Sequence, residues 1–229
     1  MRKSAEVIDY IKNTSKSYSQ LIKDVDRKFN TKIGKSLISY YKRKKPRIVP
    51  VYFENSEKWE LEWLKGLYFA DGCKFKESFR HYTIKFALDS KRDQDITRRL
   101  VNILKKMGLH LMFFNLKNVL IIKIRSKVLY NFLPNKKKIY YPKNFYAFIS
   151  GLIDGDGCTT KNAVIISQHR HKKLMNYLTS KLGLHYHNYK TKIRFGVNHK
   201  ITYYVPVKIC KKLIKSKFCV KLNRNNKDF

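Results

Sequence analysis

The chain has 229 residues, 43% of them apolar, and its 51 Lys and Arg against 16 Asp and Glu give a net charge of +35. That length can build one large domain or two small ones, and the charge predicts a polyanionic partner, nucleic acid before a membrane surface. The sequence has no secretory or lipidation signal, no apolar run of membrane-spanning length and no C-x-x-C pair among its four cysteines. These features argue against a zinc site and a membrane partner, and they predict an intracellular protein of the cytoplasm or an organellar matrix.

Residues 1–50 are expected to form a basic helical extension. Apolar spacing predicts a short helix around Val7–Ile11, a second from Ser17 to Phe29 and a third around Leu37–Tyr41, with a break at Asn30–Gly34. This order resembles a helix-turn-helix DNA-binding unit, and a helical hairpin packed on the main body is the alternative. The following stretch, residues 42–50, holds five basic residues and two prolines and is typical of a linker that lies along phosphates.

The remaining chain divides into two halves, residues 51–140 and 141–229, with the same predicted order of elements. In the first half, an apolar helix ends near residue 71 and is followed by strands at 74–80 and 82–88, a helix at 91–107, strands at 109–115 and 119–125, and a short helix closed by Pro134. In the second half, a strand at 163–168 precedes a helix at 171–182, strands at 185–197 and 200–205, and a helix at 207–214. Gly108 and Gly183 stop the two middle helices. We therefore predict an α+β fold of two pseudo-symmetric αββαββα halves.

The strongest signal is a repeated stretch, Leu64–Cys73 and Ile149–Cys158, which aligns without a gap. Each copy has small residues four apart, which share one helix face and allow two helix backbones to approach closely. Each copy ends in Asp-Gly-Cys, and its Gly is expected to end the helix in a left-handed conformation. Two such helices side by side would bring Asp71 and Asp156 together where both helix dipoles are negative, and this arrangement calls for a hard cation such as Mg²⁺ or Ca²⁺. The small residues are Gly66, Ala70, Gly151 and Gly155.

These copies resemble the LAGLIDADG homing endonuclease family in its single-chain, two-motif form, over about residues 59–218. The resemblance implies a site-specific DNA endonuclease that uses Mg²⁺, with Ca²⁺ or Mn²⁺ as substitutes, and in which Asp71 and Asp156 are the catalytic metal ligands. It also implies that the carbonyls of Ala70 and Gly155 complete the ligand set. By approximate alignment, Lys91 and Gln168 lie near the reacting water, and the run 136–138 supplies a further basic side chain.

The sixth place of the motif differs between the copies, since Phe69 stands where the family has the Asp that the second copy keeps as Asp154. The resemblance places a helix-end contact there, so the departure does not touch the catalytic acid.

Each half should contribute a four-stranded antiparallel sheet with helices on one face and an open face toward double-stranded DNA. We expect basic, polar or aromatic side chains on the two open faces to bind the DNA. These positions are Lys74, Lys76, Arg80, Lys85, Lys123 and Arg125 in the first half and Lys161, Lys190, Lys192, Arg194 and Tyr203 in the second.

Two other functions fit parts of the same sequence. An RNA maturase would use the basic surface to bind intron RNA, and a transcription regulator would combine a degenerate LAGLIDADG fold with the N-terminal helices. Both aspartates are retained, and this favours the nuclease. Because both copies lie in one chain, we expect a monomer with a long, partly asymmetric target, encoded in an intron since no splicing junction flanks the motifs.

Overall fold

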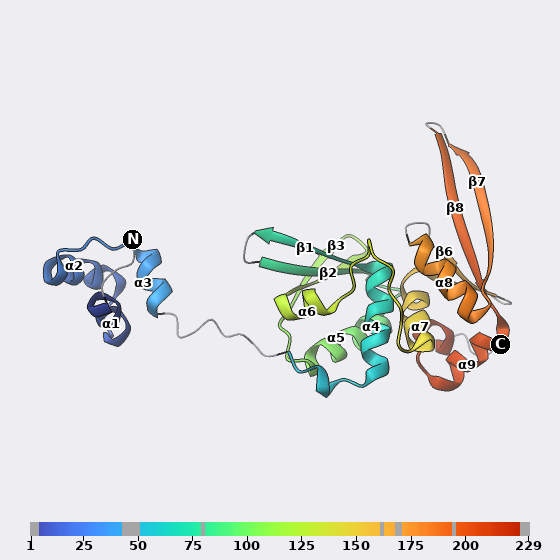
Figure 1. Cartoon of the computed structure of the whole chain (residues 1–229), viewed down its shortest axis with the longest axis horizontal. Coiled ribbons are helices and arrows are strands. Elements are labelled where there is room, and N and C mark those ends of the chain that lie inside the picture. Colours follow the sequence, from blue (N-terminus) through green and yellow to red (C-terminus); the bar gives the residue numbers. More distant parts are fainter. Residues whose placement is uncertain are drawn as a thin grey trace. The chain divides into compact units, whose positions relative to one another are not determined.

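The computed structural model describes residues 5–42, 51–78, 81–160, 163–167, 171–193 and 196–224, with backbone alone for 78, 160, 188–193 and 196–200. The chain forms two compact units, Met1–Val49 and Pro50–Phe229 (Figure 1). Each unit has its own hydrophobic core. No helix in the described ranges combines the length and hydrophobicity that crossing a bilayer requires.

The N-terminal unit is a three-helix cluster of α1 (Ala5–Asn13), α2 (Tyr18–Phe29) and α3 (Lys35–Lys42). Ser17 caps α2 in a capping box with Gln20, and Asn30 ends that helix with φ of 45°, so the predicted break lies where the chain turns. All three helices bury apolar side chains in one small core. That core consists of Val7, Ile11, Leu21, Val25, Ile33 and Ile38. The predicted helices are thus present, and they pack on one another.

The C-terminal unit contains the two predicted halves. The first consists of the short 3-10 helix η1 (Phe53–Asn55), α4 (Lys58–Asp71), β1 (Gly72–Ser78), β2 (His81–Asp89), α5 (Gln94–Lys106), β3 (Leu111–Leu116), β4 (Val119–Arg125) and α6 (Lys127–Phe132). The second consists of α7 (Phe145–Asp156), β5 (Gly157–Thr160), β6 (Ala163–Ser167), α8 (Lys172–Leu182), β7 (His185–Ile193), β8 (Gly196–Val205), α9 (Val207–Ser216) and α10 (Val220–Arg224). The sequence pattern did not indicate α10.

Each half builds one antiparallel sheet, in the order β1-β2-β4-β3 and β5-β6-β8-β7. The predicted fold class is therefore confirmed. Gly108 and Gly183 have φ of 74° and 65°, so both middle helices end in the left-handed conformation, as predicted.

Helices cover one face of each sheet, and α4 and α7 lie side by side between the halves (Figure 1). Strand alternation selects the covered face, since Ile84, Phe86 and Leu88 of β2 are buried while Ala87 is exposed. One continuous core runs through both halves, including Trp63 of α4 and Phe148 of α7. The halves therefore fold as one body.

Candidate active site

The α4–α7 pair is held together by small residues, as the repeat predicted. A methyl group added at Gly66 would lie 3.0 Å from the backbone nitrogen of Leu152, and one added at Gly151 would lie 2.7 Å from that of Leu67. Such distances leave no room for a side chain, because the obstacles are backbone atoms of the opposite helix. The helices therefore cross with their backbones almost in contact.

The same close approach brings the two acidic helix ends together. A methyl group at Gly155 of α7 would collide with Ala70 and would lie 2.8 Å from Oδ2 of Asp71, so the Asp71 carboxylate lies against the opposite helix. The half-buried Asp71 and Asp156 are the last residues of α4 and α7. The sequence prediction that they come together is consistent with this geometry.

The glycines that follow the two aspartates do not adopt the predicted left-handed conformation. Gly72 has φ of −92° and Gly157 has φ of −81°, both in extended backbone. Glycine is needed for space, because a methyl group at Gly72 would lie 2.7 Å from Cα of Tyr68 and one at Gly157 would lie 2.7 Å from Cα of Ile153. The chain passes directly from helix to strand, and each strand starts beside its aspartate.

The electrostatics of the pair show an anionic site. Burial and then the negative charge of Asp156 raise the pKa of Asp71 to about 7, with a smaller contribution from Asp93. The positive charges of Lys221 and Lys136 act in the opposite direction but do not offset burial and repulsion. Two carboxylates that repel each other at a half-buried position are stabilised by a cation.

Two lysines stand at equivalent places beside the aspartates. Nζ of Lys136 donates to the carbonyls of Phe69 (2.9 Å) and Gly72 (2.6 Å). Nζ of Lys221 donates to the carbonyls of Gly155 (2.9 Å) and Gly157 (3.0 Å). Each ammonium thus binds carbonyl oxygens at the C-terminal end of a motif helix, where the helix dipole favours positive charge.

The sequence analysis named the 136–138 run but missed Lys221. A usable signal existed, because 136 − 71 = 65 and 221 − 156 = 65. Lys91, which the alignment selected, lies exposed in the turn after β2 with its backbone N–H donating to Asp89, and Gln168 lies outside the described residues.

The residues present fit a divalent cation of the magnesium type. In the described part of the chain, no group of three or more His, Cys, Asp and Glu side chains could hold a metal. Mg²⁺ commonly binds through one or two carboxylates with water and substrate phosphate oxygens, so Asp71 and Asp156 meet this requirement. The carbonyl of Gly155, which the family resemblance made an expected metal ligand, accepts a hydrogen bond from the Lys221 ammonium. The methyl group of Ala70 packs at the contact between the two helices.

The sixth motif place makes a helix-end contact in the second half, as the resemblance implied. The buried Asp154 carboxylate accepts hydrogen bonds from the indole of Trp63 (2.8 Å) and from the backbone N–H groups of Val220 (3.0 Å) and Lys221 (2.8 Å). It therefore caps the N-terminal end of α10. In the first half, Phe69 packs its ring on Tyr140, Phe148 and His171 instead.

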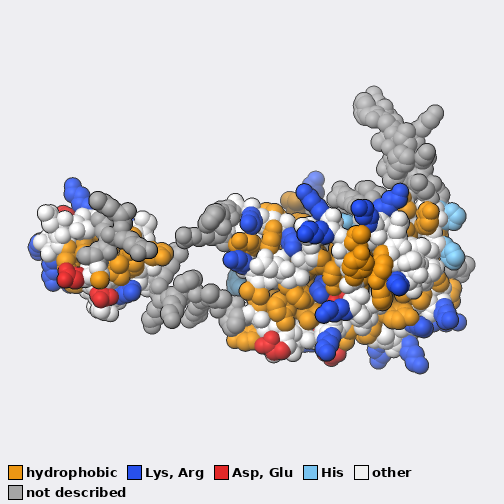
Figure 2. All heavy atoms as spheres, viewed as in Figure 1, with side chains coloured by type: hydrophobic (Ala, Val, Ile, Leu, Met, Phe, Trp, Pro, Cys, Tyr) orange, Lys and Arg blue, Asp and Glu red, His pale blue; other side chains and the backbone are white. Residues whose placement is uncertain are grey.

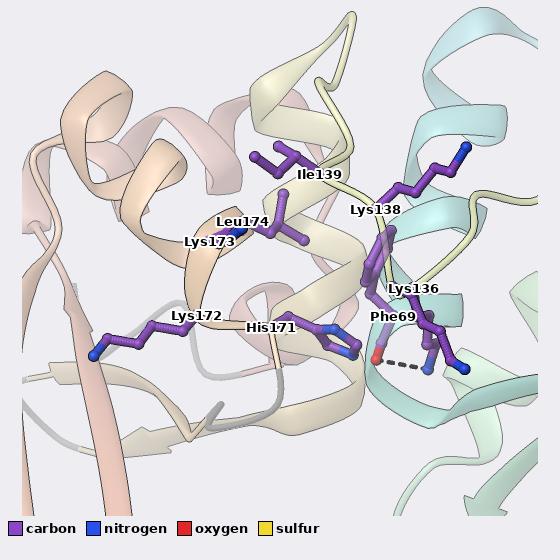
Figure 3. A pocket seen from close by; sticks show the side chains of 9 residues that line it. Phe69, Lys136, Lys138, Ile139, His171, Lys172, Lys173 and Leu174 are labelled. Atoms are coloured by element: carbon purple, nitrogen blue, oxygen red, sulfur yellow. Dashed lines mark hydrogen bonds between the residues drawn. The ribbon is translucent and has the colours of Figure 1, made fainter.

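A cavity of about 430 Å³ adjoins Phe69 (Figure 3). Lysines from the 136–138 run line it on one side, and the start of α8 lines it on the other. The dashed bond in the figure is that from Lys136 to the carbonyl of Phe69. Its lining is Phe69, Lys136, Lys137, Lys138, Ile139, His171, Lys172, Lys173 and Leu174.

The open face of the first sheet differs from the prediction in two of its lysines. Lys85, Lys123 and Arg125 do lie on this face, as expected. Lys123 and Arg125 both form ion pairs with Glu77, and its carboxylate offsets part of their positive charge on this face.

Lys74 and Lys76 point to the helix side, which corrects their assignment to the DNA face. Lys74 pairs with the buried Ile84, and its ammonium donates to the carbonyls of Tyr130 (2.7 Å) and Leu133 (2.5 Å) around the end of α6. Lys76 lies over the Tyr82 ring on the same side. Their alternation partner Phe75 occupies the open face instead, packed under Lys85.

The second sheet requires one similar correction. Tyr203 is 1% exposed and belongs to the core, so it is not available to DNA; its neighbour Tyr204 lies on the open face, with His187 against its ring. Lys190 and Lys192 lie on β7, but their side chains are not described. Arg80, Lys161 and Arg194 lie outside the described residues.

The surface of the C-terminal unit is basic on the side that Figure 2 shows, with Lys and Arg spread between apolar areas and few acidic side chains. All four cysteines are free thiols; Cys73 and Cys158 are exposed at the starts of β1 and β5. The surface chemistry therefore suits an anionic partner.

Comparisons with known proteins give one sequence relative and a likeness in fold to solved structures. No protein-family model matches the chain. An uncharacterised protein of Methanocaldococcus jannaschii, MJ0398, is 28% identical over 183 residues, which are 72% of this chain and 65% of that protein. The chain thus spans about two thirds of the curated relative it matches.

Among solved structures, the homing endonuclease I-DmoI in complex with DNA and calcium aligns with a TM-score of 0.52 and 17% identity, over 74% of this chain and 97% of that one. The N-terminal LAGLIDADG domain of WhiA aligns with a TM-score of 0.45 and 18% identity, over 74% and 87% of the two chains. At these identities the likeness concerns architecture alone. The two sheets and the central helix pair of this chain have the fold of I-DmoI.

Proposed function

We propose that this protein is a site-specific endonuclease that cuts both strands of double-stranded DNA with a divalent metal. The observation that carries the proposal is the Asp71–Asp156 pair, two half-buried carboxylates at the ends of packed helices. The pair lies between two sheets in a chain of net charge +35, so an anionic substrate is drawn to an anionic centre that holds a cation.

Asp71 and Asp156 would hold the metal, and Lys136 and Lys221 would hold the helix ends that carry them. When bound, Mg²⁺ would polarise the scissile phosphate and lower the pKa of a bound water. Both ammonium groups bind carbonyl oxygens at the helix ends, and their positive charges lower the pKa of Asp71. They would therefore position the two aspartates and reduce the repulsion between the carboxylates. One such arrangement in each half can serve one strand each.

The proposal includes a monomer, since one chain already supplies both halves. It also includes a target whose two half-sites differ, because the open faces of the two sheets differ in residues. The likeness to the DNA-bound I-DmoI fold supports DNA as the substrate class.

The test is cleavage of a supercoiled plasmid that carries the insertion site without its intron, or a site selected by binding from a random library. We expect linear DNA with Mg²⁺ and none with a chelator. Asp71→Asn and Asp156→Asn should each lower the rate of linearisation by at least about a thousandfold, because an anionic metal ligand is lost. DNA binding, measured by fluorescence anisotropy, should persist. Wild-type linearisation by either variant would refute the assignment.

A second candidate function is sequence-specific DNA binding without cleavage, as in a regulator. The separate three-helix unit Met1–Val49 favours it, because its helix α3 presents exposed polar side chains such as Lys35, Ser36 and Tyr40. The same plasmid assay separates the two, since a regulator would bind the selected site and leave it intact with every metal tested.

A further inference from the structure

The open face of the first sheet has an apolar patch that a purely electrostatic DNA contact does not require. On β2 and β4 its members alternate with the buried Phe86, Leu88 and Ile122, and on β3 they pair with open-face residues of β4, which places the set on the side away from the helices. We call this set the thymine patch. It consists of Ala87, Met112, Phe114, Leu116, Val119 and Ile121.

The register makes the patch contiguous. Ile121 is the direct partner of both Ala87 and Phe114, and Val119 is the direct partner of Leu116. Direct partners have neighbouring side chains, so Ala87, Ile121 and Phe114 form an apolar row across three strands, and Val119 and Leu116 form a second row that ends at Asp89 of β2. Phe114 is 50% exposed, Leu116 64% and Val119 38%. An exposed apolar area of this kind marks a binding surface.

The patch is continuous with the basic part of the same face. The next row of the register holds Lys85 and Lys123, with Met112 as the direct partner of Lys123. In the other direction along the register, Gly72 pairs with Phe86, so the apolar rows lie at the end of the sheet beside Asp71. One ligand that contacts the aspartates and the lysines would therefore also cover the patch.

The second sheet has no counterpart among its described open-face residues. Its face holds Ala163, Ile165, Ser167, Thr202 and Tyr204, with His185 and His187 on the neighbouring strand, and the row of Ser167, Thr202 and His187, which corresponds to Ala87, Ile121 and Phe114, is polar. The two sheets would thus meet the two halves of one ligand with different chemistry.

We infer that the thymine patch contacts the 5-methyl groups of thymines in the major groove, so that one half-site requires A·T pairs beneath it. This inference rests on the proposed function. Thymine is the base that presents an apolar group in the major groove, and alanine and phenylalanine side chains are suited to contact it. The lysine row beside the patch provides the charge complementarity for the flanking phosphates.

A second copy of the chain is the other occupant to consider, because β3 is an edge strand. Each copy carries a charge of +35, so two copies placed face to face would bring like charges together. A polyanion with methyl groups would neutralise the positive charge and would also bury the exposed apolar surface.

The experiment starts with selection of bound duplexes from a randomised library without added magnesium. We expect one half-site to be enriched in A·T pairs at adjacent positions. In the selected duplex, each thymine is then replaced by uracil, which removes the methyl group and keeps the base pair. Binding should weaken about fourfold for each methyl group contacted by the patch, and thymines in the other half-site should tolerate the change.

Phe114→Ser should remove this discrimination, so that thymine and uracil duplexes bind equally. Phe113→Ser is the matched control, since Phe113 is the next residue of the same strand, is also 50% exposed, and shares the opposite face with Ile122. The control should keep the fourfold preference, and thermal unfolding of both variants verifies that they fold.

Other results would overturn the inference in distinguishable ways. A selected site in which every uracil is tolerated would refute the thymine contact and leave site-specific binding intact. Binding with no enriched sequence would refute the proposed function together with the inference. A dimer in sedimentation analysis that Phe114→Ser dissociates would show that the patch is an interface between copies.

Discussion

Equivalent positions of the central helices α4 and α7 make different contacts: a hydrogen-bonded pair at one place and an aromatic pair at the other. Residues 85 apart correspond, so the Trp63–Asp154 pair, which joins α4 to α7, matches the Phe148–Phe69 pair, which joins the same two helices, since 63 + 85 = 148 and 69 + 85 = 154. The first pair is a buried hydrogen bond of 2.8 Å, and the second is an edge-to-face ring contact with centroids 5.6 Å apart. The polar partners occur together in one pair and the aromatic partners in the other, so neither pair leaves a buried polar side chain without a partner.

The exchange affects how each lysine is held. Asp154 caps α10, and α10 carries Lys221 to the helix end. The side chain of Phe69 cannot accept hydrogen bonds, and the chain around Lys136 forms a turn in which the N–H groups of Lys137 and Lys138 donate to Asn135. Both arrangements place an ammonium beside an aspartate. The two halves therefore share the position of the lysine ammonium, and they differ in the local structure that holds it, which is a capped helix for Lys221 and a turn for Lys136.

The largest expected effect tests what the halves have in common. Gly66→Val and Gly151→Val should each destabilise the fold by more than about 4 kcal/mol, because a side chain would meet backbone atoms of the opposite helix. Urea denaturation followed by circular dichroism measures this, with the exposed Cys158→Val as the control in the same unit. A loss below about 1 kcal/mol in either variant would show that the helices do not approach so closely.

The next effect tests where the halves differ. Asp154→Ala should cost about 3–5 kcal/mol, because it leaves the Trp63 indole and two backbone N–H groups buried without an acceptor. Phe69→Leu, at the matching position, should cost less than about 1.5 kcal/mol because the change conserves apolar volume. Equal losses, measured by the same denaturation, would contradict the contrast between a polar and an apolar support.

The pH dependence tests the acid pair. Since the pKa of Asp71 is about 7 when folded and near 3.8 when unfolded, the folded state binds the proton more tightly between these values. Stability without metal and DNA should therefore fall as pH rises from about 4 to 7, by up to about 4 kcal/mol from this group. Burial also raises the pKa of Asp154, which adds a change of the same sign.

Asp71→Asn should remove the Asp71 contribution, and its stability should exceed that of the wild type at pH 8. Added Mg²⁺ should stabilise the wild type at pH 8 more than the variant, because the cation offsets the repulsion between the carboxylates. Thermal unfolding at pH 5 and pH 8 checks both expectations. A wild type that gains stability between these pH values would contradict the raised pKa.

The smallest effect compares the two lysines. Lys221→Met should raise the pKa of Asp71 more than Lys136→Met does, because the charge of Lys221 has the stronger influence on that carboxyl. Carbon NMR titration of the aspartate carboxyls measures both changes. Lys91→Met, at an exposed turn position, is the control and should leave the titration unaltered. A larger rise in the pKa of Asp71 with Lys136→Met than with Lys221→Met would contradict the stronger influence of the Lys221 charge.

The sequence by itself determined the fold class, the helix pair and its small residues. These follow from local periodicity, from glycine spacing and from a repeat that aligns without gaps, all of which are properties of short segments. It also determined that Asp71 and Asp156 end the two helices, because Asp-Gly-Cys follows each apolar run.

The tertiary structure alone decided which strand face is open and what holds each lysine. Alternation divides a strand into two faces but does not show which face the helices cover. The sequence analysis therefore placed Lys74 and Lys76 on the wrong face of the first sheet and Tyr203 on the wrong face of the second sheet. Lys221 was missed because α10 is too short to show a helical period and depends on the Asp154 carboxylate, which is 67 residues away from Lys221 in the chain. Contacts between distant residues of this kind form only when the whole chain packs, and no local pattern encodes them.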